Sequence, residues 1–136
     1  MRYDSRVATT VEDVMTPDPV TLSPMATVGD AYALMTERGF RHVPIVEGDL
    51  LIGVISMTDI GRLGARVPQI LAMPLHEVMT TDIITVTPGE TVDVAAATMA
   101  ARRINCLLVV IGRQLSGIVT TYDLLDALAR SARANQ

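Results

Sequence analysis

Apolar residues recur at helical spacing in the segment around residue 30. The positions that share this spacing are Val28, Ala31, Leu34 and Met35. The pattern predicts a helix over about residues 28–38 with one face turned toward a core. Thr27, with Asp30 three residues later, is typical of a helix start, and Gly39 is typical of a helix end.

Two runs of β-branched residues follow this helix. Residues 42–46 and 50–55 are separated by Glu47-Gly48-Asp49, which predicts two strands joined by a hairpin-type turn. Three further elements are expected in this half: a short capped helix over 10–15, a brief strand over 20–22, and a second helix that starts after Ser56 and ends at about 61–64.

The same succession returns 64 residues later. The pairs that carry the repeat are Val14-Met15-Thr16 with Val78-Met79-Thr80, Gly53 with Gly117, and Asp59 with Asp123. The second copy is expected to contain a helix over 92–103, strands over 106–111 and 115–119, and a helix over 121–133. The order β-α-β-β-α therefore occurs twice, in repeats 1–66 and 67–136. Two copies are too few for a long solenoid, so we expect two half-units that pack together, with any functional site at their junction.

The segment between the copies, about residues 62–74, is short and apolar. This composition is unlike that of a flexible tether, and a helical turn is expected near 68–72.

The turn from strand to helix carries the most chemistry. Each copy reads Gly-h-h-[Ser/Thr]-x-x-Asp, where h is an apolar residue, and the residues concerned are Gly53, Ser56, Asp59, Gly117, Thr120 and Asp123. A hydroxyl followed three residues later by an acid is typical of a capping box. The same groups could also bind a ligand, because helix N–H groups attract phosphate and a carboxylate can accept both hydroxyls of a ribose. The glycine is not needed for a cap and could permit a close backbone approach.

Composition narrows the class of protein. Of 136 residues, 49% are hydrophobic and 19% charged, which is typical of a globular chain and excludes disorder. A net charge of −4 argues against a nucleic-acid partner. The longest apolar run, residues 106–111, is too short to span a membrane. Residues 1–6 lack the apolar core of a signal peptide, and one cysteine cannot form an internal disulfide. We therefore expect a cytoplasmic protein.

The sequence shows no arrangement of residues that is typical of a catalytic site. Cys106 lies in a strongly apolar run and is typical of a small core residue rather than a nucleophile. His42 and His76 have no spacing that suggests a metal pair. Asp59 and Asp123 are accounted for as helix-start groups. We expect no catalytic residues, no metal and no enzyme activity.

The whole pattern resembles the CBS domain, the family named after cystathionine β-synthase. The repeated order of elements, the Gly-h-h-[Ser/Thr]-x-x-Asp ending, the Val-Met-Thr openings and the segment 41–46 carry the resemblance, over about residues 11–130. It implies an α+β fold in which two β-α-β-β-α units, related by a pseudo-twofold axis, pack through their sheets. It also implies a regulatory, energy-sensing module that binds an adenosine-containing ligand (AMP, ADP or ATP) in clefts between the repeats and requires no cofactor.

The resemblance implies two unequal sites. In the better one Asp123 would bind the ribose and Thr120 a phosphate. Arg41 and His42 would supply positive charge to the phosphates, and Val20 and Pro44 would flank the adenine. The full set is Thr16, Val20, Arg41, His42, Val43, Pro44, Thr120 and Asp123. The weaker set is Ser56, Asp59, Thr80, Ile84, Asn105, Cys106, Leu107 and Leu108. Asn105-Cys106 stands there where the better set has Arg41-His42, which removes positive charge. Arg102 and Arg103 could compensate, although Arg38 and Arg102 are more typical of charges at a helix end.

Two alternatives stay open at this point. The ligand could be S-adenosylmethionine, or the chain could be a structural or dimerisation module without a ligand. A homodimer is expected in either case, and a target protein would act in trans. The candidate contact faces hold Val94, Ala97, Ala101, Leu124 and Leu128, which could equally cover the chain's own core.

Overall fold

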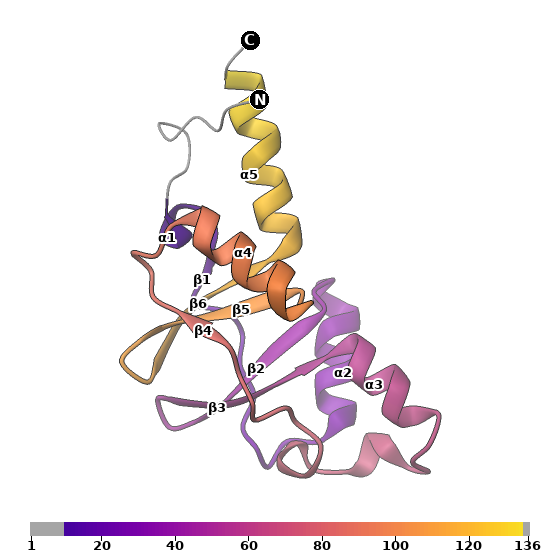
Figure 1. Ribbon diagram of the computed structural model, residues 1–136. Coiled ribbons are helices and arrows are strands. Elements are labelled where there is room, and N and C mark those ends of the chain that lie inside the picture. The colour runs from indigo at the N-terminus through magenta and orange to yellow at the C-terminus, as the bar shows by residue number, and fades with distance from the viewer. Residues whose placement is uncertain (1–9, 135–136) are drawn as a thin grey trace. The chain divides into compact units, whose positions relative to one another are not determined.

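The computed structural model describes residues 10–134 and divides them into two compact units. The central unit comprises residues 19–83, and the terminal unit comprises residues up to 18 together with those from 84 onward. Both are mixtures of helices and strands (Figure 1), so the predicted α+β class is confirmed. Residues 1–6, which carried the signal-peptide argument, lie outside the described residues.

The central unit is built on a hairpin with two helices. Strands β2 and β3 pair antiparallel, with a register shift between Ile45 and Val46, and α2 and α3 lie beside them (Figure 1). Leu22 forms a single parallel bridge to Ile45 in place of the predicted strand 20–22. The elements are α2 (Val28–Arg38), β2 (His42–Glu47), β3 (Leu50–Ser56), α3 (Met57–Gly64) and the 3₁₀ turns η1 (Ile70–Ala72) and η2 (Leu75–Glu77).

Helix α2 has the bounds that its pattern predicts. The Thr27 hydroxyl accepts a hydrogen bond from the Asp30 amide at 3.1 Å, and an Asp30 carboxylate oxygen accepts one from the Thr27 amide at 2.9 Å. Gly39 ends the helix at φ +80°, a left-handed conformation that glycine adopts without strain. Val28, Ala31 and Met35 are buried in the core of the central unit, as expected for one apolar stripe.

The terminal unit holds a sheet of four short strands in the order β4-β5-β6-β1. Strand β4 is parallel to β5, and the other two pairings are antiparallel. Its elements are α1 (Val11–Val14), β1 (Thr16–Pro17), β4 (Thr85–Val86), α4 (Val92–Arg102), β5 (Cys106–Ile111), β6 (Gln114–Thr120) and α5 (Thr121–Ala134). Its core contains Val92, Ala95, Leu107 and Val109.

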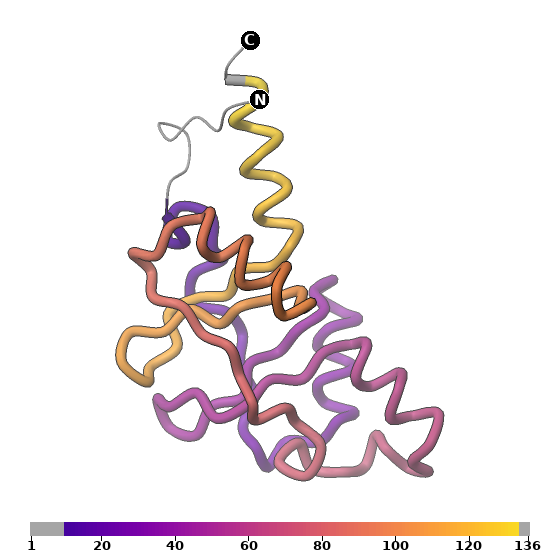
Figure 2. Tube along the Cα trace, viewed as in Figure 1, coloured from indigo at the N-terminus to yellow at the C-terminus, as the bar shows by residue number. Residues whose placement is uncertain are grey.

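The opening segment of each repeat packs on the body of the other repeat. Figure 2 shows the indigo segment of α1 beside the orange and yellow segments of the terminal unit. Val11 is fully buried in that unit's core, and its amide donates to the carbonyl of Glu90 at 2.8 Å. Leu75 holds the equivalent position, 64 residues on, and is fully buried in the core of the central unit. The compact units therefore differ from the sequence repeats 1–66 and 67–136, which divide the chain by similarity rather than by contact.

No helix within residues 10–134 combines the length and the apolar character that crossing a membrane requires. In the same part of the chain, no three acidic, histidine or cysteine side chains gather in a way that could hold a metal ion.

Candidate functional site

In the terminal unit, the predicted turn joins β6 to α5. One carboxylate oxygen of Asp123, Oδ2, accepts from the Thr120 amide at 2.8 Å and from the Thr120 hydroxyl at 3.0 Å. The Asp123 amide in turn donates to the Thr120 hydroxyl oxygen at 3.3 Å. The other oxygen, Oδ1, accepts no hydrogen bond from residues 10–134. The turn is thus a capping box that leaves one carboxylate oxygen open.

In the central unit, the equivalent turn joins β3 to α3. Asp59 Oδ2 accepts from the Ser56 amide at 3.1 Å, and the Asp59 amide donates to the Ser56 hydroxyl at 3.0 Å. Here Oδ1 is also occupied, because the Arg62 guanidinium donates to it at 3.0 Å. Both oxygens of Asp59 are therefore engaged within a single turn of helix.

The same capping geometry occurs at helices that belong to neither predicted site. Thr10 and Asp13 form a capping box at α1, and Thr27 and Asp30 form one at α2. The hydroxyl-x-x-Asp spacing is therefore first of all a helix-start signal in this chain. The glycine three residues before the hydroxyl distinguishes the two candidate turns from these others.

The two glycines allow the exchanged segments to approach. A Cβ added at Gly117 would lie 2.5 Å from the sulfur of Met15 and 2.9 Å from the carbonyl oxygen of Thr16. At Gly53 it would lie 2.5 Å from the sulfur of Met79 and 3.2 Å from the carbonyl oxygen of Thr80. The close approach expected at these positions is thus made by the chain's own Met-Thr segments.

Thr16 and Thr80 are placed by this packing. The backbone of Thr16 pairs with that of Ile118, two residues before Thr120. Thr80 pairs with Val54, two residues before Ser56, through hydrogen bonds of 2.9 and 3.0 Å. Each threonine is exposed. Each therefore lies near the turn of its own unit, a relation that the duplicated Met-Thr and Gly could have signalled.

Arg41 and His42 lie beside the Ser56–Asp59 turn within the central unit. His42 pairs with Ser56 across the hairpin, and the Arg41 carbonyl accepts from the Met57 amide at 2.9 Å. Burial lowers the pKa of His42 below its ordinary value; Asp59 opposes this shift and Arg41 adds to it. Burial therefore works against a positive charge on His42, and the expected contact of His42 with phosphates stays a prediction.

Asn105 and Cys106 hold the equivalent place in the terminal unit. The Asn105 carbonyl accepts from the Thr121 amide at 3.0 Å, and Cys106 pairs with Thr120. Cys106 is half-buried, whereas its neighbour Leu107 is fully buried.

The remaining strand candidates are buried. The side chains of Val43, Pro44, Leu107 and Leu108 are all fully buried, so they are not available to a ligand and only their backbone could contact one. Pro44 accepts from the Leu22 amide at 3.1 Å, which brings the exposed Val20 segment alongside it. Ile84 similarly accepts from the Leu108 amide at 3.3 Å.

The two units divide both predicted sets. From the better set, the terminal unit brings together Thr16, Thr120 and Asp123, and the central unit Val20, Arg41, His42, Val43 and Pro44. From the weaker set, the central unit holds Ser56, Asp59 and Thr80, and the terminal unit Ile84, Asn105, Cys106, Leu107 and Leu108. The joining of these groups into two sites stays a prediction.

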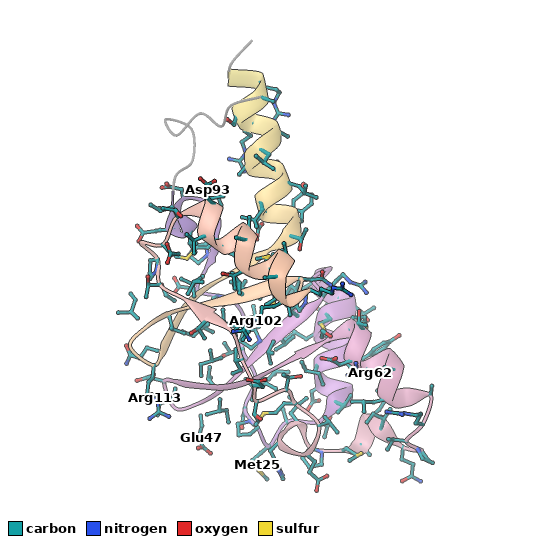
Figure 3. The ribbon with its side chains drawn as sticks, viewed as in Figure 1. Met25, Glu47, Arg62, Asp93, Arg102 and Arg113 are labelled. Atoms are coloured by element: carbon teal, nitrogen blue, oxygen red, sulfur yellow. The ribbon has the colours of Figure 1, made fainter. Side chains whose placement is uncertain are left out.

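Three arginines and one leucine of the candidate surfaces lie at helix ends or in a core. Arg38 lies in the last turn of α2, and Arg102, labelled in Figure 3, lies in the last turn of α4, as expected for charges that complement a helix dipole. Arg103 follows α4 in the left-handed conformation. Leu124 is buried in the core of the terminal unit, so it is wrong as a candidate for a dimer contact.

Comparison with curated proteins gives relatives of two kinds. The chain is 32% identical over 114 residues to the CBS domain-containing protein YhcV of Bacillus subtilis (strain 168), which covers 84% of this chain and 81% of that protein. It is 30% identical over 118 residues to the homoserine O-acetyltransferase of Methanohalobium evestigatum, of which it spans only 23%. The enzyme name belongs to that much longer protein as a whole.

Solved structures of the same architecture include two that contain adenosine compounds. CBSX2 in complex with AMP is 25% identical, with a TM-score of 0.77, and the match covers 89% of this chain and 96% of that one. The CBS domain pair of MJ0100, in complex with 5′-methylthioadenosine and S-adenosyl-L-methionine, is 28% identical, with a TM-score of 0.80 and coverage of 94% and 98%. The CBS domain model itself matches twice, at residues 11–64 and 75–130, and the chain belongs to the CBS domain family as a pair of such domains.

Proposed function

We propose that this chain is a regulatory module that binds an adenosine-containing ligand. The observation that carries the proposal is the duplicated Gly-h-h-[Ser/Thr]-x-x-Asp turn in a chain that resembles two solved structures, one holding AMP and one holding 5′-methylthioadenosine and S-adenosylmethionine. Adenosine is the group that those ligands share, and a carboxylate at a helix start can accept hydrogen bonds from the hydroxyls of its ribose.

Asp123 is the residue proposed to hold the ribose. Its Oδ2 is used by the cap, while its Oδ1 accepts no hydrogen bond within residues 10–134. A carboxylate accepts hydrogen bonds from neutral hydroxyls more strongly than an uncharged acceptor does. The cap also holds the side chain in one rotamer, so the entropy of ordering it is already lost before a ligand arrives.

The proposed nucleotides are AMP, ADP or ATP, and the predicted partners of Asp123 account for this choice. Arg41 is exposed and offers a bidentate donor to phosphate. Burial lowers the pKa of His42, and a phosphate beside it would favour its protonation. Val20 is 39% exposed and offers apolar surface for adenine, whereas Pro44, on the adjacent segment, is fully buried and could contact the base only through its backbone.

Calorimetric titration with AMP, ADP, ATP and S-adenosylmethionine tests the proposal. We expect saturable binding of at least one of the three nucleotides. Binding of S-adenosylmethionine alone would transfer the proposal to that ligand, because its sulfonium group needs no phosphate contact. An absence of heat and of any thermal shift with all four compounds would contradict ligand binding and favour a structural module.

A homodimer is the second part of the proposal. Helix α5 exposes Tyr122, Leu125 and Leu128 to the extent of 73%, 60% and 46%, and α4 exposes 46% of Val94. Exposed apolar side chains at spacings of three along one helix are typical of a contact face. Light scattering at micromolar concentration should give twice the chain mass, and Leu125→Asp should return it to one chain. A monomeric mass of the unaltered protein would refute the dimer.

A further inference from the structure

We propose that Arg62 is a specificity-determining residue that occupies the carboxylate of Asp59. Of the two candidate turns, only the one that carries Asp123 is then open to the hydroxyls of a ribose. This inference rests on the proposed function and deepens it, because it states why one turn binds better than the other.

The ion pair at the first turn is direct. The Arg62 guanidinium donates to Asp59 Oδ1 at 3.0 Å, and Asp59 Oδ2 accepts from the Ser56 amide. The Asp59 side chain is only 21% exposed, and the guanidinium lies on its accessible side, since the Arg62 side chain is 64% exposed. A ribose that approaches Asp59 must therefore displace the guanidinium.

The second copy reverses the charge at the same position. Position 126, which is 64 residues after Arg62, is Asp126. Asp126 pairs with Arg130 one turn further along α5, and no cation within residues 10–134 pairs with Asp123. The chain thus keeps the capping acid in both copies but places a competing cation beside only one of them.

The competition is between a guanidinium and neutral hydroxyls for one oxygen. An exposed ion pair three residues apart on a helix is weak in water. The expected effect is therefore modest, about two- to fivefold in affinity, which is the free energy of such a pair converted to a ratio of dissociation constants. It falls on the contact to the ribose rather than on the contact to a phosphate.

Uncharged adenosine is the probe that isolates this contact, because changes of protein charge act on it least. In an Asp123→Ala background, which leaves Asp59 as the only candidate, Arg62→Met should tighten adenosine binding about two- to fivefold. Methionine keeps the length of the aliphatic stem and removes the guanidinium. Arg66→Met removes an exposed charge from the same unit and should leave the affinity unchanged.

The reciprocal experiment installs the competitor in the other turn. In an Asp59→Ala background, Asp126→Arg should weaken adenosine binding by a similar factor, while Asp126→Ala should have no effect. Unchanged or weaker binding on Arg62→Met would overturn the inference. If neither Asp59→Ala nor Asp123→Ala alters adenosine binding by the otherwise unchanged chain, the proposed function fails instead.

Discussion

The two strand-to-helix turns share a backbone plan and differ in charge. Near Asp59 the chain places Arg41, Arg62 and His42, and His42 is the first residue of β2, where burial lowers its pKa. The equivalent positions around Asp123 hold Asn105, Asp126 and Cys106. The difference shows that capping geometry and binding chemistry are set by separate residues: the cap needs only the hydroxyl and the acid, and the neighbours decide whether that acid is open.

Comparison of equivalent positions also gives direct tests, because each residue has a counterpart 64 positions away.

The largest effect is expected at the exchanged core positions. Leu75→Ala should lower the free energy of unfolding by about 2–5 kcal/mol, because it opens a cavity in the core of the central unit. Val11→Ala, its counterpart in the terminal unit, removes less volume and should cost less. Urea unfolding followed by circular dichroism measures both. A cost below 1 kcal/mol for Leu75→Ala would contradict the exchange of opening segments.

The glycines before the two turns should come next. Gly117→Ala should destabilise the fold by about 1–3 kcal/mol, because its Cβ would meet the Thr16 carbonyl as well as the Met15 sulfur. Gly53→Ala should cost less, because its nearest backbone atom is farther away and a Met79 side chain can move. Thermal unfolding of both variants tests the order, and the reverse order would show that backbone crowding does not decide it.

A smaller change in stability, of opposite sign, is expected at the helix ends. Arg103 follows α4 at φ +54°, whereas its counterpart Gly39 follows α2 at φ +80°. Arg103→Gly should stabilise the protein by about 1 kcal/mol, since glycine adopts this conformation without strain. Gly39→Arg should destabilise it. Equal melting temperatures for Arg103→Gly and the unaltered protein would indicate that the left-handed residue carries no cost.

The free energy of unfolding should also depend on pH through His42. Burial lowers the pKa of His42 in the folded protein, so the unfolded chain binds this proton first as the pH falls. The free energy of unfolding should therefore decrease as the pH drops from 7 through about 6.5, the unfolded pKa. His42→Gln should flatten this slope. A slope that the substitution leaves unchanged would assign the effect to other groups.

Most helices and strands were predictable because their signals are local. Thr27, Asp30 and Gly39 delimit α2 as expected, and β5 has the predicted bounds. The bounds of α4 and α5 differ from prediction by one residue at their ends. Such ends follow from caps and apolar spacing, which act within a few residues.

The exchange of opening segments was not predicted, because pairing between distant segments leaves no local trace. Its signal was present in the repeat itself: Met15 and Met79 recur with Gly117 and Gly53, and each sulfur packs on the glycine of the other copy. The lowered pKa of His42 could not be predicted for a related reason, since it comes from burial in the folded unit. The Asp59–Arg62 pair could have been found from spacing, as residues three apart on a helix are neighbours.

The affinity of the two aspartates for a nucleotide tests the account most directly. Asp123→Ala should weaken the binding of AMP by about ten- to a hundredfold, the cost of losing a charged hydrogen bond, and Asp59→Ala should weaken it less. Asp30→Ala is the matched control, because it removes a capping carboxylate of the same geometry outside both predicted sites. Calorimetry on the three variants should show the loss of about ten- to a hundredfold in AMP affinity only for Asp123→Ala. An equal or larger loss for Asp59→Ala, or the same loss for Asp30→Ala, would contradict the account.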